Sequence, residues 1–62
     1  MGKLTINQWM GLKEIKGFEL AKKTGLTEGT ISNIRQGKVK PKLETLQKIA
    51  EVLGIGIDEI EI

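Results

Sequence analysis

The sequence predicts an all-α protein, a compact bundle of four to five short helices. Two observations lead to this fold class. Apolar residues recur at intervals of three and four along successive segments, which is the period of an amphipathic helix. Glycine follows three of these segments, at Gly25, Gly37 and Gly54, where a left-handed residue commonly ends a helix. A chain of 62 residues, 1–62, is expected to form a single domain.

The first helix is predicted to begin after Thr5. Residues 5–8 read TINQ, the Thr-x-x-Gln form of a capping box, in which Thr5 and Gln8 each bond the backbone of the other. The helix would carry Ile6, Trp9 and Met10 on its apolar side. Trp9 is interpreted as a core residue, and the alternative is a ring that stacks on a ligand.

Two short helices are predicted next, over residues 17–24 and 28–36. Gly25 breaks the apolar pattern where a tight turn is needed, and Thr27 offers a hydroxyl that caps the next helix. Glu28 lies in the first turn of that helix, where the helix dipole favours negative charge. Ala21 is small, as expected where two helices cross closely through a short turn.

A fourth helix and a short closing segment are predicted in the last third of the chain. Pro41 stiffens the basic loop 37–42, because its ring fixes its own φ. Residues 43–53 then keep an amphipathic pattern. Residues 57–60 are expected to form a last turn or helix, and 60–62 alternate like a strand fragment. The predicted core consists of Ile6, Trp9, Leu20, Ala21, Leu26, Ile31, Ile34, Leu43, Leu46, Ala50 and Leu53.

The segment GFELAKKTGLTEGTISNIRQ, residues 17–36, with the following Gly37-Lys38, resembles the helix-turn-helix of phage repressor and Cro-type regulators, the Xre family. The likeness continues through the fourth helix and covers about residues 6–60. The resemblance implies a lambda-repressor-like DNA-binding domain. In such a domain, the helix over 28–36 is the recognition helix that enters the major groove.

The resemblance also implies which side chains read bases. An asparagine side chain can form a pair of hydrogen bonds with adenine, and a glutamate side chain can accept a hydrogen bond from cytosine. Asn33 and Glu28 therefore suit this role chemically. The alternative for Asn33 is an exposed polar residue on a helix. The expected base-reading residues are Thr27, Glu28, Gly29, Ser32 and Asn33.

The net charge of +2 divides unevenly along the chain. Residues 16–42 hold seven bases against two acids, a balance of +5, and residues 43–62 hold one base against five acids, a balance of −4. This asymmetry favours a phosphate-facing side, although lysines that merely solvate helix faces would also produce it. The expected phosphate contacts are Lys16, Gly17, Thr30, Arg35, Gln36, Lys38, Lys40 and Lys42.

Some positions depart from the family pattern. Family members often pair an arginine in the first helix with a glutamate late in the recognition helix, and the aligned residues here are Met10 and Arg35. Arg35 would then be free to bind phosphate, Glu14 or Gln36. Gly17 stands where the family often has a polar side chain, so only its backbone could contact phosphate.

Composition excludes several classes of protein. The chain has neither cysteine nor histidine, so disulfides, thiolate metal sites and a histidine general base are excluded, and neither a metal nor a cofactor nor an enzyme is expected. No apolar run approaches a membrane span. The expected location is the cytoplasm, associated with the nucleoid, in a prokaryotic or phage-encoded protein.

The leading hypothesis is a sequence-specific regulator of transcription that binds double-stranded DNA, a small repressor that occupies an operator as a homodimer. One alternative is a protein-interaction module that keeps the fold and has lost base readout, as Glu28 and Gly29 suggest. The dimer contact could be formed by the isoleucines of the acidic end, and the alternative is that they pack within the monomer. These are Ile55, Ile57, Ile60 and Ile62.

Overall fold

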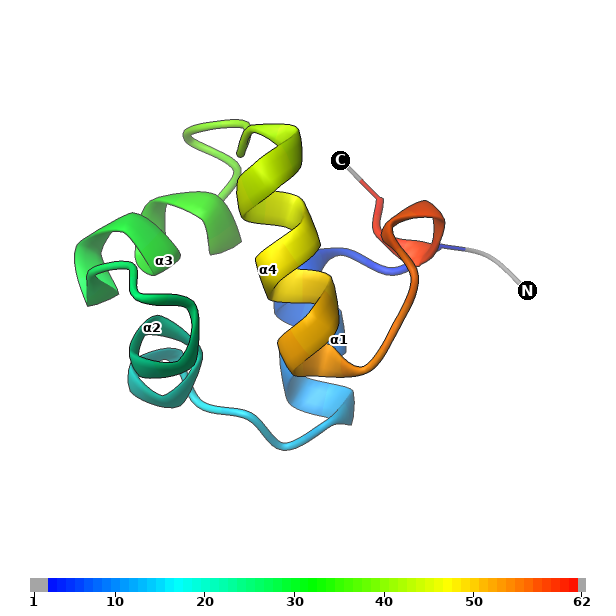
Figure 1. Ribbon diagram of the computed structural model, residues 1–62, viewed down its shortest axis with the longest axis horizontal. Coiled ribbons are helices and arrows are strands. Elements are labelled where there is room, and N and C mark those ends of the chain that lie inside the picture. Colours follow the sequence, from blue (N-terminus) through cyan, green and yellow to red (C-terminus); the bar gives the residue numbers. More distant parts are fainter. Residues whose placement is uncertain (1–2, 62) are drawn as a thin grey trace.

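The computed structural model describes residues 3–61, which form four α-helices and a closing 3-10 turn. The elements are α1 (Ile6–Leu12), α2 (Gly17–Thr24), α3 (Glu28–Arg35), α4 (Leu43–Leu53) and η1 (Ile57–Glu59). In Figure 1, α4 crosses the middle of the molecule with α1 behind it, α2 and α3 lie on one side, and η1 lies on the other with both chain ends. The predicted all-α bundle is confirmed.

The helix boundaries follow the local signals in the sequence. The Gln8 backbone N–H donates to Thr5 Oγ1 at 3.1 Å, and the Thr5 N–H donates to Gln8 Oε1 at 2.9 Å, so the capping box of α1 is confirmed. The helix over 17–24 is also confirmed. Helix α3 ends at Arg35, one residue before the predicted end, and Gln36 is its C-terminal cap residue.

Each of the four helices is followed within two residues by a residue with positive φ, and one of these residues is not glycine. Gly25, Gly37 and Gly54 have φ values of 79°, 76° and 72°. At the end of α1 the residue is Glu14, with a φ of 58°. Its N–H donates to the Gly11 carbonyl at 3.2 Å, and the next N–H donates to the Met10 carbonyl at 2.9 Å. This pair of bonds is a Schellman motif, which glycine usually completes.

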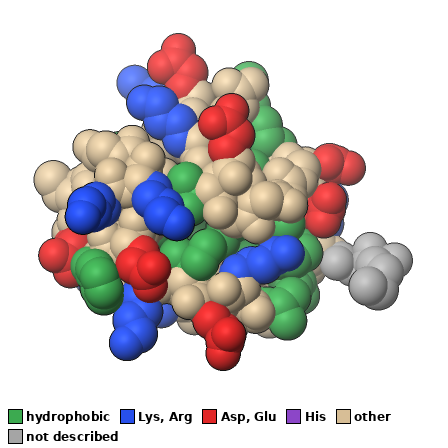
Figure 2. Space-filling model, turned by 60° about the horizontal axis from the view of Figure 1, so that its bottom comes forward, with side chains coloured by type: hydrophobic (Ala, Val, Ile, Leu, Met, Phe, Trp, Pro, Cys, Tyr) green, Lys and Arg blue, Asp and Glu red, His purple; other side chains and the backbone are tan. Residues whose placement is uncertain are grey.

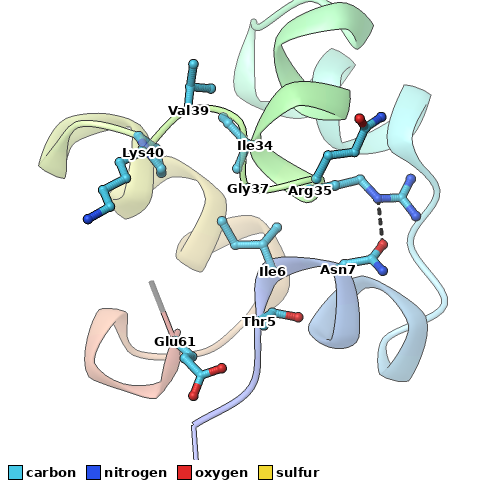
Figure 3. A pocket seen from close by; sticks show the side chains of 11 residues that line it. Thr5, Ile6, Asn7, Ile34, Arg35, Gly37, Val39, Lys40 and Glu61 are labelled. Atoms are coloured by element: carbon cyan, nitrogen blue, oxygen red, sulfur yellow. Dashed lines mark hydrogen bonds between the residues drawn. The ribbon is translucent and has the colours of Figure 1, made fainter.

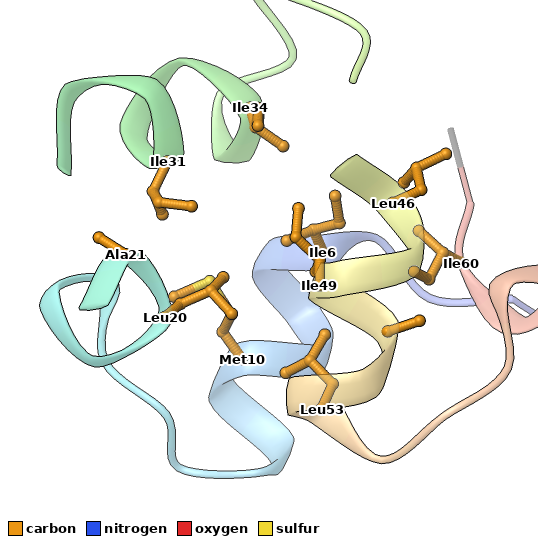
Figure 4. Close-up of a cluster of buried hydrophobic side chains, with 11 residues drawn as sticks. Ile6, Met10, Leu20, Ala21, Ile31, Ile34, Leu46, Ile49, Leu53 and Ile60 are labelled. Atoms are coloured by element: carbon orange, nitrogen blue, oxygen red, sulfur yellow. The ribbon is translucent and has the colours of Figure 1, made fainter. Parts of the chain in front are cut away.

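The buried side chains form one contiguous cluster between the helices (Figure 4). Most of the predicted core lies in it, and Trp9 and Leu26 pack half-buried against it. Three hydrophobic residues outside the predicted set are also buried: Met10, Ile49 and Ile60. The buried hydrophobic residues are Ile6, Met10, Leu20, Ala21, Ile31, Ile34, Leu46, Ile49, Ala50, Leu53 and Ile60.

Leu43 does not belong to the core, and its prediction was wrong. Its side chain is 63% exposed. Leu43 is the first residue of α4, directly after the loop, and Leu46 is the first leucine of this helix that packs inside. Periodicity identifies the apolar face of a helix, but burial also requires a neighbour opposite each turn.

The C-terminal segment is attached to the start of the chain by backbone pairing. Leu4 and Ile60 form an isolated parallel β-bridge, with Leu4 N–H bonded to the Glu59 carbonyl at 3.3 Å and Glu61 N–H bonded to the Leu4 carbonyl at 2.8 Å. The Trp9 indole N–H donates to the same Glu59 carbonyl at 2.9 Å. The Trp9 ring therefore joins α1 to this segment, in agreement with the core interpretation.

This attachment corrects one predicted dimer contact. Ile60 is 2% exposed and packs in the core of the monomer, so its side chain is not available to a second subunit. Ile55 and Ile57 are half-buried against the core, and Ile62 lies outside the described residues. The alternative of packing within the monomer therefore holds for Ile60.

Two features are absent from the described part of the chain. Residues 3–61 contain no helix that is long and apolar enough to cross a bilayer. They also bring together no group of three or more His, Cys, Asp or Glu side chains that could hold a metal ion.

Candidate nucleic-acid interface

The turn between α2 and α3 is fixed by a left-handed glycine and a buried threonine. The Gly25 N–H donates to the Ala21 carbonyl at 2.9 Å, which closes α2. The Thr24 hydroxyl is buried; it donates to the Leu20 carbonyl at 2.7 Å and accepts from the Leu26 N–H at 3.4 Å. Thr24 thus satisfies polar groups on both sides of the turn. The sequence predicted residue 24 only as the end of the helix over 17–24, and the bonds of its hydroxyl are seen in the structure.

Helix α3 begins at the capping residue that the sequence predicts. The Thr30 N–H donates to Thr27 Oγ1 at 3.1 Å, and the two hydroxyls bond each other at 2.9 Å. Glu28 follows in the first turn. The first turn of α3 is therefore capped by Thr27, whose hydroxyl satisfies a backbone N–H that has no partner within the helix.

Helix α3 has an inner face and an outer face, with its buried residues three positions apart. Ile31 and Ile34 are buried against α2 and the core, and Figure 4 shows both pointing toward the other helices. Ala21 of α2 lies opposite Ile31, where its small side chain permits the close crossing. The five residues expected to read bases are all exposed: Thr27, Glu28, Gly29, Ser32 and Asn33.

The C-terminal end of α3 leads directly into the basic loop. Gly37 N–H donates to the Ile34 carbonyl at 3.1 Å and Lys38 N–H to the Asn33 carbonyl at 2.9 Å, a Schellman motif. Lys38, Lys40 and Lys42 follow and are exposed.

The other expected phosphate contacts differ in their exposure. Lys16 precedes the first residue of α2 and is exposed, whereas Gly17 and Thr30 are half-buried. Gln36 is exposed, and its amide donates to the Ser32 hydroxyl at 2.9 Å.

Arg35 has a partner that sequence analysis did not consider. Its Nε donates to the Asn7 side-chain carbonyl at 2.8 Å, rather than to Glu14 or Gln36. Asn7 lies in the first turn of α1, 28 residues earlier, so no local pattern could have indicated this contact. The bond joins the recognition-helix candidate directly to α1.

A hollow of about 340 Å³ lies beside this end of α3, between the first turn of α1, the basic loop and Glu61 (Figure 3). Apolar Ile34 and Val39 line it together with Arg35 and Lys40. The hollow lies between the first turn of α1 and the loop that carries the expected phosphate-contacting lysines.

The basic region 16–42 and the acidic region 43–62 of the sequence do not separate into a basic face and an acidic face in every view of the structure. Figure 2 brings the lower edge of Figure 1 forward and shows basic and acidic side chains interspersed around a few hydrophobic ones. Among large hydrophobic residues, Leu12, Phe18, Val39 and Leu43 are exposed. The case for a phosphate-facing side therefore depends on the individual positions of the basic residues around α3.

Comparison with known proteins matches nearly the whole chain to one family. The family model for a Cro/C1-type HTH DNA-binding domain matches residues 5–62. The HTH-type transcriptional regulator PuuR of Escherichia coli (strain K12) is 43% identical over 54 residues, which are 87% of this chain and 28% of PuuR.

Two further relatives carry similar descriptions. An uncharacterized HTH-type transcriptional regulator of Haemophilus influenzae is 48% identical over 40 residues, 64% of this chain and 17% of the relative. The uncharacterized HTH-type transcriptional regulator MJ0272 of Methanocaldococcus jannaschii is 35% identical over 55 residues, 89% of this chain and 83% of the relative. No solved structure gives a significant match. The chain thus spans less than a third of PuuR and most of MJ0272.

Proposed function

Because the chain belongs to the Cro/C1-type helix-turn-helix DNA-binding family, we propose that it is a sequence-specific regulator of transcription, a small repressor that binds an operator. It acts by occupying double-stranded DNA and carries out no chemical reaction. The observation that supports this most is the two-sided character of α3. Its two isoleucines are held in the core, and all five proposed base-reading side chains or positions are exposed.

The proposed readout uses the outer face of α3. Asn33 has an exposed carboxamide that can bond an adenine through paired hydrogen bonds, and Glu28 can accept from a cytosine amino group. Thr27 presents a methyl group to a thymine, Ser32 can bond several bases, and Gly29 lets the backbone approach closely.

The proposed phosphate contacts surround that face and supply affinity without sequence preference. Lys38, Lys40 and Lys42 lie exposed after α3, and Lys16 and the Gly17 amide lie at the start of α2. Thr30, Arg35 and Gln36 complete the set on α3 itself. Each phosphate neutralised by a basic group adds about 0.9 to the logarithmic salt dependence of binding.

A dimer is proposed for a reason of geometry. One recognition helix reads only a few base pairs, and two domains on half-sites about one helical turn apart supply a longer target. Ile55 and Ile57, half-buried near the end of the chain, together with Ile62, are the apolar residues proposed for contact between subunits.

The experiment that tests this function selects bound duplexes from a random library and then titrates the selected duplex with two variants. Asn33→Ala should relax sequence preference by about 1 to 3 kcal/mol at one base pair. Lys40→Ala should weaken all duplexes alike and reduce the salt slope by about 0.9. Equal affinity of the unaltered protein for unrelated duplexes would contradict sequence-specific regulation, and a lack of DNA binding at moderate salt would favour the interaction module.

A further inference from the structure

Arg35 is held in one orientation by a contact across the domain. Its Nε donates to Asn7 Oδ1 at 2.8 Å, and Figure 3 shows the guanidinium extending past Asn7 with its two terminal nitrogens directed away from the core. Among residues 3–61, Asn7 is the hydrogen-bond partner of this guanidinium. The terminal nitrogens therefore remain available to a ligand.

The guanidinium also occupies the space beside Gly17. A Cβ added at Gly17 would lie 3.4 Å from Arg35 Nη1. Gly17 is the position where sequence analysis found no polar side chain to contact phosphate. The structure therefore places a cation from α3 at the start of α2, where residue 17 itself offers only backbone.

A polar hollow of about 230 Å³ adjoins this guanidinium. Asn7, Ser32, Arg35 and Gln36 line it, and no carboxylate is among them. Asn7 Oδ1 is used by Arg35, which leaves its amide N–H groups as donors. Ser32 Oγ accepts from the Gln36 amide, which leaves its hydroxyl hydrogen as a donor. A hollow with one cation and several donors suits an anion.

We propose that this hollow binds a phosphate group of the DNA backbone, with Arg35 as the contacting residue and Asn7 as the positioning residue for it. The inference rests on the proposed DNA-binding function and adds a residue of α1 to the interface. Arginine loses rotamer freedom when it binds, and a side chain already fixed by Asn7 loses less. Asn7 thus raises affinity for every duplex without reading a base.

The test is a double-mutant cycle on the selected duplex and on an unrelated duplex, measured by fluorescence anisotropy at several salt concentrations. Arg35→Ala should weaken binding to both duplexes about tenfold and reduce the salt slope by about 0.9. Asn7→Ala should weaken binding about threefold with the salt slope retained. In the Arg35→Ala background, Asn7→Ala should weaken binding much less than threefold, because only the amide donors of Asn7 are then lost.

Two controls separate this role from folding and from net charge. Lys48→Ala removes the same charge from an exposed position on α4 and should leave affinity nearly unchanged. Circular dichroism at the binding temperature must show each variant folded. If Arg35→Ala unfolds, Arg35→Met replaces it, since methionine keeps the apolar stem but has neither the charge nor a donor to bond Asn7, and Asn7→Ala should then have a much smaller effect in that background.

The outcomes distinguish this inference from the proposed function. If the unaltered protein binds no duplex, both are overturned. If it binds and the effects of Asn7→Ala and Arg35→Ala simply add, or if Lys48→Ala weakens binding as much as Arg35→Ala, only the role of the hollow is overturned.

Discussion

The two faces of α3 use the same helix for different purposes. Ile31 and Ile34 are almost fully buried, whereas Ser32 and Asn33 between them are exposed. The inner pair holds the helix at a fixed angle through the hydrophobic core, and the outer residues add little to that core. The comparison teaches that the residues that stabilise the core and the residues proposed to read DNA are different residues of one helix. Substitutions should therefore affect one property or the other.

The largest expected effect comes from removing inner-face volume. Ile31→Ala leaves a cavity in the core and should lower the free energy of unfolding by about 2 to 5 kcal/mol. A core of this size rarely supplies more than about 3 to 5 kcal/mol, so the variant should be largely unfolded. Thermal unfolding followed by circular dichroism measures this. The matched outer-face variant Ser32→Ala should keep its melting temperature, and an equal loss in both variants would refute the separation.

A smaller effect is expected at the turn that sets the angle between α2 and α3. Thr24→Val keeps the side-chain shape but removes the hydroxyl, which leaves the Leu26 N–H without its partner. The free energy of unfolding should fall by about 1 to 2 kcal/mol. Chemical denaturation monitored by Trp9 fluorescence provides the measurement. An unchanged denaturation midpoint would show that the hydroxyl does not stabilise the turn.

Substituting the two glycines that lie inside helices, Gly11 in α1 and Gly29 in α3, tests the difference between stability and the proposed readout further. A Cβ at Gly11 meets nothing within 4 Å, and one at Gly29 meets only Thr27 Oγ1 at 3.9 Å. Gly11→Ala and Gly29→Ala should each stabilise the domain by about 0.5 to 1 kcal/mol, because alanine restricts the unfolded chain and favours helix. Melting temperatures test this part. Only Gly29→Ala, on the proposed reading face, should alter the duplexes selected from a random library.

The smallest effect is expected where the core prediction was wrong. Leu43→Ala should change the free energy of unfolding by less than about 0.5 kcal/mol, since this side chain is at the surface. The same substitution at Leu46, three residues later and buried, should cost about 2 to 5 kcal/mol. Thermal melts of the two variants provide the measurement. An equal loss of unfolding free energy in both would show that Leu43 contributes to the core.

Much of the fold could be predicted because its signals are local. The Thr5 capping box, the Thr27 cap and the glycines that end α2, α3 and α4 each act within a few residues, so their positions fix helix boundaries directly. The end of α1 shows the limit of this reasoning. There Glu14 adopts the left-handed conformation, and no glycine at this position marks the end of the helix in the sequence.

The candidate site was predictable to the same extent. The exposed positions on α3 follow from helical period once Ile31 and Ile34 are placed in the core, and the lysines of the basic loop are visible in the sequence. The roles of Asn7 and Thr24 were not visible. The Asn7 contact joins residues 28 apart, so only the packed structure decides it. The bonds of Thr24 reach only from residue 20 to residue 26, so they are a local feature that the predicted helix and turn did not include.

The sequence by itself determined the order of the helices, most of their caps and the division of α3 into two faces, because these depend on neighbours three or four residues away. The tertiary structure alone decided that Ile60 packs in the core, that Leu43 remains exposed and that Arg35 bonds Asn7. These features join segments that lie far apart in the chain or depend on what covers a helix turn. Periodicity carries no information about such partners, because it describes a helix and not what surrounds it.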